Sequence, residues 1–303
     1  MSLDPADRRL LLVHAHPDDE TIGTGATMAK YVADGAQVTL ITCTLGEEGE
    51  VLVPELEHLS VEHDDALGPH RVGELADAMA ILGVTDHRFL GGEGHFRDSG
   101  MKWAENGSAT ARDETRPDTF WHADLREAAD LMVQVIRETR PQVLVAYDEF
   151  GGYGHPDHVQ AHRVATYGAD LAAVRSYKPE LGEAWDVPKI YWTAMSQREM
   201  SDGIRALREA GDLTTFEDWD PDNVPMGSPD ADLDAAIDGS AFIEAKMDAM
   251  KAHATQITVD GPFFALSNNL GNTVWATEYF RLARGTRGPV DDRGLETDLF
   301  AGL

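Results

Sequence analysis

The chain has 303 residues, of which 42% are hydrophobic and 26% charged, enough for one large α/β domain or two small ones with a buried core. Asp and Glu number 54 against 25 Lys and Arg, so the formal net charge is −29, which argues against nucleic acid and anionic membrane as partners. The single cysteine, Cys43, excludes an intramolecular disulfide and a cysteine-rich zinc site. No apolar run is long enough for a signal peptide or a spanning helix, so we expect a cytoplasmic protein.

The first stretch of the chain predicts a strand, a turn, a helix and a second strand. Residues 10–14 form a continuous apolar run, as in a strand buried on both faces, and Pro17 ends it. Apolar residues recur at helical spacing over 19–34 until Gly35, and β-branched residues dominate 37–43. This βαβ unit indicates a parallel sheet.

The alternation of helices and strands continues along the chain. Helices are predicted over 70–82, 119–140, 158–173 and 240–254, and strands over 87–90, 143–147 and 189–193. The pattern predicts an α/β, Rossmann-like layered fold with a mostly parallel sheet and a C-terminal elaboration. We expect one domain over 1–303, with a core at 8–195 and the elaboration at 196–303.

Three polar stretches interrupt the predicted elements, at 46–68, 91–117 and 211–239. The last is acidic and rich in Asp and Pro. We interpret it as a mobile surface loop within the domain, because ordered sequence resumes at Ala241, and we assign it no role.

Two short segments share the pattern His-Pro-Asp, and each follows a predicted buried strand. Residues 14–20 read His-Ala-His-Pro-Asp-Asp-Glu, and residues 153–158 read Tyr-Gly-His-Pro-Asp-His. Ligands of open parallel α/β sheets bind at the carboxyl ends of the strands. We therefore expect the two segments to meet at one crevice.

The residue types in these segments are those of a hydrolytic metal site, which needs about three protein ligands and an open position. His16, Asp19 and His158 would supply two imidazoles and one carboxylate, a set suited to one Zn²⁺ per subunit and also to Fe²⁺ or another divalent metal. Asp18 is a spare carboxylate that could take a proton from the attacking water.

Other residues of the two segments have both functional and ordinary interpretations. Asp157 could orient His155, whose charged imidazole could stabilise an oxyanion. However, His-Pro-Asp is a common turn, and Asp-Asp-Glu before a helix is ordinary capping and helix-dipole matching. His14 ends the first strand, and we expect it to be a hydrogen-bonded core histidine rather than a ligand.

At these residues the sequence resembles the PIG-L family of zinc-dependent sugar N-deacetylases, whose markers are His-Pro-Asp-Asp-Glu near the N-terminus and a later His-Pro-Asp-His. Further segments at 44–51, 70–75, 97–101, 151–155, 252–256, 266–269 and 296–299 resemble the subfamily of mycothiol biosynthesis. The resemblance implies an amidohydrolase that removes acetate from an N-acetylglucosaminyl-inositol, a small amino-sugar substrate.

The resemblance also implies roles for individual residues. It assigns the zinc ligands to His16, Asp19 and His158 and the general base to Asp18.

Five further roles follow from the same resemblance. His155 would stabilise or protonate the tetrahedral intermediate, with Asp157 behind it. Tyr153 would polarise the substrate carbonyl, and its neighbouring glycines permit loop motion. Arg71 and Asp98 would hold sugar and inositol hydroxyls, although a solvated helix arginine and a turn-forming aspartate are the ordinary interpretations of these two.

Two alternative functions remain open from the sequence. A mycothiol S-conjugate amidase would share every motif, although that subfamily tends to carry a lysine where this chain has Thr21, Ile22 and Gly23. A non-catalytic nucleotide-binding module is suggested by Gly23 and Gly25, but the strand-to-helix turn holds carboxylates that would repel a pyrophosphate. The oligomeric state is not predicted.

Overall fold

A computed structural model describes residues 3–105, 107–114 and 116–303; positions 106 and 115 of the polar stretch 91–117 lie outside this part. The helices are α1 (Asp19–Ala33), α2 (Leu67–Leu82), α3 (Leu125–Thr139), α4 (Gly151–Gly154), α5 (Pro156–Ala172), α6 (Gln197–Glu209), α7 (Ile243–Ala252) and α8 (Pro262–Leu270). The strands are β1 (Arg9–His14), β2 (Gln37–Thr42), β3 (Asp86–Phe89), β4 (Lys102–Trp103), β5 (Ala109–Thr110), β6 (Val143–Ala146), β7 (Lys189–Ala194), β8 (Ala235–Asp238) and β9 (Thr277–Arg284).

The main sheet has seven strands in the order β3-β2-β1-β6-β7-β9-β8. The first five run parallel, and β9 is antiparallel to both of its neighbours. The strand order reverses between β1 and β6, which pair directly although more than a hundred residues separate them. The predicted α/β fold with a mostly parallel sheet is confirmed.

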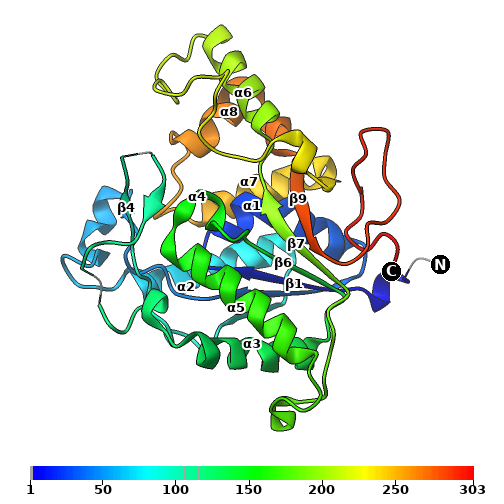
Figure 1. Cartoon of the computed structure of the whole chain (residues 1–303). Helices are drawn as coiled ribbons and strands as arrows, with labels where there is room; N and C mark the ends of the chain where they lie inside the picture. Colours follow the sequence, from blue (N-terminus) through cyan, green and yellow to red (C-terminus); the bar gives the residue numbers. More distant parts are fainter. Residues whose placement is uncertain (1–2, 106, 115) are drawn as a thin grey trace.

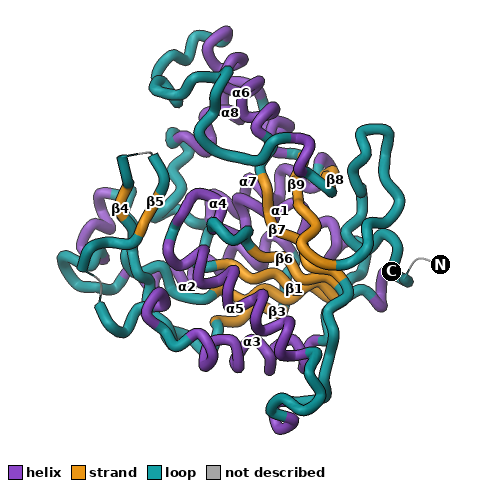
Figure 2. Tube along the Cα trace, viewed as in Figure 1, coloured by secondary structure: helices purple, strands orange, loops and turns teal. Residues whose placement is uncertain are grey.

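Helices cover both faces of the sheet, and this explains why its central strands are apolar throughout. Leu11 and Val13 of β1 pack into a core beneath α3 and α5, whereas Leu10 and Leu12 pack into a second core with α1, α2 and α7. Figure 2 shows the strands between the helices, and Figure 1 shows α3 and α5 side by side on one face. A strand in this position is buried on both sides, as the run at 10–14 predicts.

The helix predicted over 119–140 begins later than expected. Asp124 caps α3 by accepting hydrogen bonds from the backbone N–H groups of Arg126 and Glu127. The preceding residues form a separate 3₁₀ turn, Phe120–His122. The cap rather than the apolar spacing fixes the start of the helix, because its carboxylate satisfies the first free N–H groups.

The C-terminal part extends the sheet instead of standing apart from it. Strands β8 and β9 add two antiparallel strands next to β7, and α7 packs on α1 and α2. Because β8 lies inside the stretch 211–239, the prediction that this whole stretch is a loop is wrong. Helices α6 and α8 contact each other and form a lobe at the top of Figure 1.

Buried ion pairs tie this C-terminal part to the rest of the sheet. Lys246 of α7 lies 2.7 Å from Glu278 of β9, and Lys189 of β7 lies 2.6 Å from Glu296, with all four side chains at most 3% exposed. Glu278 also accepts hydrogen bonds from two backbone N–H groups of α1. Because each of these buried charges has a partner of opposite charge, the free-energy cost of removing it from water is largely offset.

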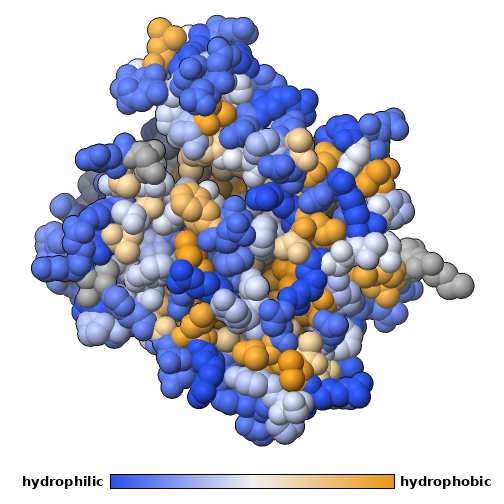
Figure 3. Space-filling model, viewed as in Figure 1, coloured by the Kyte–Doolittle hydropathy of each residue, from blue (hydrophilic) through white to orange (hydrophobic). Residues whose placement is uncertain are grey.

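The surface reflects the composition of the chain. Hydrophilic residues cover most of the face in Figure 3, with apolar residues scattered among them. Among the described residues, none of the helices has the length and apolar character that a membrane crossing requires.

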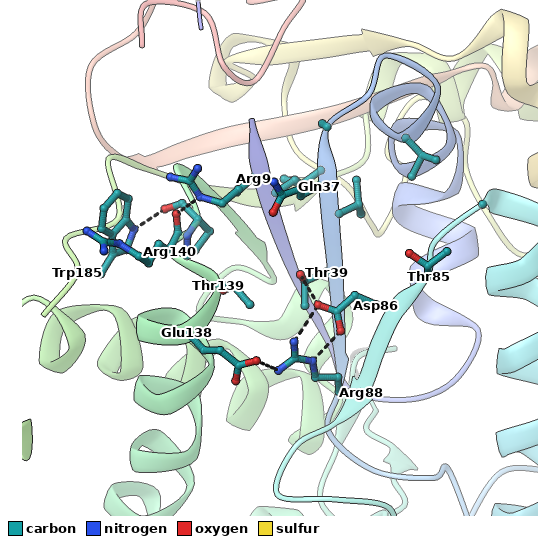
Figure 4. Close-up of a pocket in the computed structure, with 16 residues that line it drawn as sticks. Arg9, Gln37, Thr39, Thr85, Asp86, Arg88, Glu138, Thr139, Arg140 and Trp185 are labelled. Carbon is teal, nitrogen blue, oxygen red and sulfur yellow. Dashed lines mark hydrogen bonds and ion pairs between the residues drawn. The ribbon is translucent and has the colours of Figure 1, made fainter. Parts of the chain in front are cut away.

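A hollow of about 790 Å³ lies at the amino ends of the parallel strands, lined in part by the first residues of β1, β2 and β3. Figure 4 shows Arg88 between Asp86 and Glu138, at 2.6 and 2.9 Å. Arg140 lies over the Trp185 ring. Arg88 and the two carboxylates of this hollow are therefore paired with one another.

Candidate metal centre and active site

The two His-Pro-Asp segments meet at the opposite, carboxyl edge of the sheet. The first follows the end of β1 and the second follows the end of β6, and these strands are neighbours at the point where the strand order reverses. Loops that leave two such strands diverge to opposite faces and leave a crevice between them.

The first segment makes a tight turn into α1. The backbone N–H of His16 donates to Asp19 Oδ2 at 2.9 Å, and Asp18 adopts φ 118° and ψ −36°. A non-glycine residue rarely adopts such a φ. The turn directs the side chains of both Asp18 and Asp19 to the crevice side of the α1 N-terminus, where the helix dipole favours negative charge.

The second segment enters α5 through the glycine-rich turn of α4. Gly151 has φ 70°, and a Cβ at this position would lie 2.7 Å from His158 Cβ and 2.8 Å from the backbone nitrogen of Val159. Only glycine therefore allows the turn to close over His158. His155 is the N-cap of α5 and Asp157 is its second residue, and the Asp157 N–H donates to His155 Nδ1 at 3.1 Å.

Asp19 lies between two buried imidazoles. One of its carboxylate oxygens is 3.3 Å from His16 Nδ1, and the other is 3.3 Å from His158 Nε2. The structure thus brings His16, Asp19 and His158 together from segments about 140 residues apart. Burial raises the pKa of Asp19, but the two histidines outweigh it and hold that pKa well below its usual value.

His158 provides the test of whether this cluster fits a metal ion. Its Nδ1 lies 3.1 Å from the carbonyl oxygen of Gly151, which fixes the proton on Nδ1 and leaves a lone pair on Nε2. That Nε2 is buried and has no hydrogen-bond partner. An unpartnered imidazole lone pair beside a carboxylate is what a divalent transition metal accepts, so the residues fit.

Within the described residues, two groups of three offer ligand atoms within 4.8 Å of one another: His16, His155 and His158, and His16, Asp98 and Asp157. Asp19 belongs to neither group. It nevertheless contacts two histidines of the first group with separate oxygens, whereas His155 already uses Nδ1 as an acceptor. The donor chemistry therefore favours Asp19 as the third ligand.

Two further carboxylates contact His16 on the ring nitrogen that faces away from Asp19. Asp98 Oδ1 and Asp157 Oδ2 lie 3.4 and 3.3 Å from His16 Nε2. Asp157 is fully buried and accepts hydrogen bonds from both the N–H and the hydroxyl of Ser99. Burial alone would lower the pKa of His16, but the surrounding carboxylates raise it well above its usual value.

This arrangement corrects the expected role of Asp157. The sequence placed its carboxylate behind His155, but the structure directs that carboxylate to His16, and only the Asp157 backbone contacts His155. The reason is the helix start: the side chain of the second residue of α5 points back across the crevice to β1, while its N–H points to the capping imidazole.

The expectation of a charged imidazole at His155 also needs correction. Burial, together with His16 and His158, lowers the pKa of His155 to about 2. The ring is therefore neutral, and because Nδ1 accepts from the Asp157 N–H, its proton lies on Nε2. His155 can donate a hydrogen bond without carrying a charge.

Arg71 contacts the candidate base instead of an open sugar-binding surface. It is 2% exposed, and its guanidinium donates to Asp18 Oδ2 at 2.9 Å and to the carbonyl oxygens of Gly46 and Pro17. Burial raises the pKa of Asp18 to about 6, with Arg71 opposing the rise and Asp19 adding to it. Protein groups thus engage Nη1 and Nη2 of Arg71, and its contact with a sugar hydroxyl stays a prediction.

Asp98, the other predicted sugar-binding residue, is 4% exposed. Besides His16, it accepts hydrogen bonds from the backbone N–H groups of Glu48 and Gly100 at 3.1 and 2.8 Å. It therefore contacts a candidate ligand, and its predicted role in binding substrate hydroxyls stays a prediction.

Aromatic rings pack around His158 in this cluster. Tyr153 packs edge-on against His158 with ring centroids 5.0 Å apart, and Trp103 lies 6.1 Å beyond Tyr153. Tyr147 stacks on His158 at 4.2 Å, and its hydroxyl accepts from the Ala15 N–H. Burial raises the pKa of Tyr153, so its hydroxyl keeps its proton as a donor.

The sequence analysis missed several of these contacts. It treated Tyr147 as the end of a strand and did not single out Ser99, although the segment 97–101 contributed to the family resemblance. The prediction for His14 is confirmed, because this buried histidine lies 3.3 Å from the Tyr147 hydroxyl and 3.1 Å from Thr24 Oγ1.

Comparisons with known proteins agree with this site. Residues 11–167, just over half of the chain, match the model of the PIG-L family, described as GlcNAc-PI de-N-acetylase. The chain is 66% identical over 299 residues to a 1D-myo-inositol 2-acetamido-2-deoxy-alpha-D-glucopyranoside deacetylase of Nocardioides sp., covering 98% of this chain and 99% of that protein. It is 67% identical to a protein of the same name from Kribbella flavida, with 98% of each chain covered.

Solved structures of lower identity share the fold. The N,N'-diacetylchitobiose deacetylase of Pyrococcus horikoshii is 16% identical with a TM-score of 0.59, covering 92% of this chain and 84% of that one. A zinc-inhibited form of a teicoplanin deacetylase is 19% identical with a TM-score of 0.54, covering 90% and 97%. With a family match over more than half of its length and relatives at 66–67% identity, the chain belongs to the PIG-L family of de-N-acetylases.

Proposed function

We propose that this enzyme hydrolyses the acetamide of N-acetylglucosaminyl-inositol, releasing acetate and the free amino sugar. The observation that carries the proposal is the buried cluster in which Asp19 lies between His16 and His158. The names of the two relatives at 66–67% identity, which match over nearly their whole length, support the choice of substrate. The product retains the glycosidic bond and carries a primary amine.

We assign one Zn²⁺ per subunit to His16 Nδ1, Asp19 and His158 Nε2. When bound, the ion would supply Lewis-acid chemistry, polarising the acetyl carbonyl and making water a stronger nucleophile. The set of two imidazoles and one carboxylate leaves a position open for substrate, as hydrolytic sites require.

We assign the role of general base to Asp18. It lies between the proposed ligands His16 and Asp19 in the first segment, and the Arg71 guanidinium donates to one of its oxygens at 2.9 Å. The other oxygen accepts the proton of a water molecule as the water oxygen bonds to the acetyl carbon. The carbon–nitrogen bond then breaks, and Asp18 returns the proton that it took from the water to the nitrogen, which leaves as the amine.

Tyr153 and His155 supply hydrogen bonds to the carbonyl oxygen as it gains negative charge. The phenol keeps its proton, and the neutral His155 ring donates from Nε2. Donors that are already oriented before the reaction stabilise such an oxyanion most effectively. A Tyr153→Phe substitution removes one of them, and we expect kcat to fall by roughly 10²- to 10³-fold, measured as acetate release per bound metal.

The decisive assay measures acetate release from N-acetylglucosaminyl-inositol by the purified protein, with and without chelator and after addition of Zn²⁺ or Fe²⁺. Activity that is lost on chelation and restored by metal supports the proposal. A parallel assay with a bimane conjugate of mycothiol tests the amidase alternative. A higher kcat/KM on the conjugate than on the inositol substrate would overturn the proposed substrate, and activity that survives chelation would overturn the metal.

A further inference from the structure

The backbone of Asp18 is held in an unusual conformation. Four other described non-glycine residues have a positive φ, at 37–56°, within the left-handed region that turns commonly use. Asp18 has φ 118°, far outside that region. Such a conformation persists only where neighbouring groups enforce it, and it is often found where a side chain must be presented in one direction.

Glu20 enforces the conformation from within the same turn. Its Oε2 accepts the backbone N–H of Asp18 at 2.9 Å, and its side chain is fully buried. A buried carboxylate is costly unless both oxygens have partners. The orientation of Asp18 therefore depends on whatever group satisfies the other oxygen of Glu20.

That group is His253, which lies 233 residues further along the chain. Its Nε2 donates to Glu20 Oε1 at 2.8 Å, and both side chains are 0% exposed. His253 follows the last residue of α7, and its N–H and carbonyl oxygen make the hydrogen bonds of a helix end with Met250 and Gln256. The imidazole takes no part in that capping and reaches across to α1 instead.

We propose that His253 is a positioning residue that, through Glu20, holds Asp18 in its catalytic orientation. This inference rests on the proposed role of Asp18 as general base. It gives the C-terminal part a function in catalysis, because that part supplies the group that completes the turn at the α1 N-terminus. Among the described residues, the His253 side chain contacts Glu20 and none of His16, Asp19 and His158.

The contact between Thr255 and Glu74 provides a control, because it anchors the segment after α7 without positioning Asp18. Thr255 also comes from the segment after α7, is also 0% exposed, and also binds a buried carboxylate of the core. Its N–H and hydroxyl donate to the two oxygens of Glu74 in α2, at 2.8 and 2.7 Å. This contact anchors the same segment but makes no contact with Asp18, so Thr255→Val is a matched control.

The test compares His253→Leu, His253→Gln and Thr255→Val in steady-state acetate release, normalised to bound metal. In His253→Leu we expect kcat to fall by roughly 10- to 100-fold with KM changed less than about threefold. In His253→Gln the amide nitrogen lies where Nε2 was, and kcat should recover to within about threefold of wild type. Thr255→Val should lower thermal stability and leave kcat unchanged.

A crystal structure of His253→Leu provides a second readout that does not require activity. We expect Asp18 to leave its positive φ and its N–H to separate from Glu20 Oε2, while His16, Asp19 and His158 keep their places and their metal content. If wild-type protein releases no acetate, the proposed function fails, and this structure still decides the inference.

Three results would overturn the positioning role. They are an unchanged kcat in His253→Leu, an Asp18 backbone that stays in place in that variant, and an equal loss of kcat in Thr255→Val. If His253→Leu does not fold, His253→Asn replaces it, because its shorter amide keeps a polar group in the site but cannot reach Glu20. The proposal then requires a lower kcat in His253→Asn than in His253→Gln, and equal values would refute it.

Discussion

The two edges of the central sheet both carry charged and polar side chains, but these side chains differ in whether they have partners within the protein. At the amino edge, a hollow of about 790 Å³ contains Arg88 between two carboxylates and Arg140 over an indole ring. At the carboxyl edge, His158 Nε2 has no hydrogen-bond partner, Asp18 has a strained backbone, and three carboxylates surround His16. The hollow at the amino edge thus contains paired charges, whereas the carboxyl edge contains a buried ring nitrogen without a hydrogen-bond partner.

The comparison indicates that the candidate site lies where ionisable groups have shifted pKa values or lack hydrogen-bond partners, and not at the hollow of the amino edge. Paired charges at the amino edge already have their best partners, so a ligand would gain little there. At the carboxyl edge, shifted pKa values and an orphaned nitrogen are tolerated because the site is completed by groups that it binds. The following substitutions test this difference, beginning with the largest expected effect.

Replacing His158 with alanine should abolish metal binding and activity together. The loss should exceed the roughly 100-fold that removal of an outer-shell partner costs, because a ligand itself is removed. Metal content after dialysis and acetate release measure the two effects. His162→Ala, one turn further along α5, is the control and should keep its metal; retention of metal by His158→Ala would contradict the ligand assignment.

An Asp18→Asn variant should separate turnover from metal binding. The amide keeps the size of the side chain but is a poor proton acceptor, so we expect kcat to fall by about 10²- to 10⁴-fold with metal content unchanged. Asp19→Asn, at the next position, should instead lose metal. Wild-type turnover in a fully metal-loaded Asp18→Asn preparation would remove Asp18 from the role of base.

A Ser99→Ala variant should weaken metal binding to a smaller extent. It removes the hydroxyl that holds Asp157 behind His16, and loss of such an outer contact lowers metal affinity by about tenfold. Competition with a chelator of known affinity measures the change. Ser196→Ala is similarly buried but its hydroxyl binds Asp230, so it should have no effect, and equal affinities in the two variants would argue against this support of His16.

At the amino edge, Arg88→Ala should have the smallest effect. Its ion pairs with Asp86 and Glu138 are one-third or more exposed, so we expect a change in the free energy of unfolding of at most about 1 kcal/mol. Turnover should not change. Urea unfolding and kcat measure the two quantities, and a tenfold loss of kcat would show that the amino edge takes part in function.

Much of the core could be predicted from local patterns. The apolar run of β1 and the helical spacing of α1 define their elements within a residue or two of the observed bounds, because burial on two faces leaves few alternative sequences. Strands β8 and β9 were missed. They pair antiparallel at the edge beyond β7, and short strands of that kind depend on their neighbours more than on their own propensity.

The amino-acid sequence by itself determined the family, the layered fold and the two segments that carry His16, Asp19 and His158, because metal-ligand types at strand ends form a local signal. Only the tertiary structure decided what each polar side chain contacts. Asp157 binds His16, Arg71 binds Asp18, and His253 reaches Glu20 across 233 residues of chain. These partners depend on the packing of the helices, because a buried charge is stabilised only by groups that the packing brings within hydrogen-bonding distance.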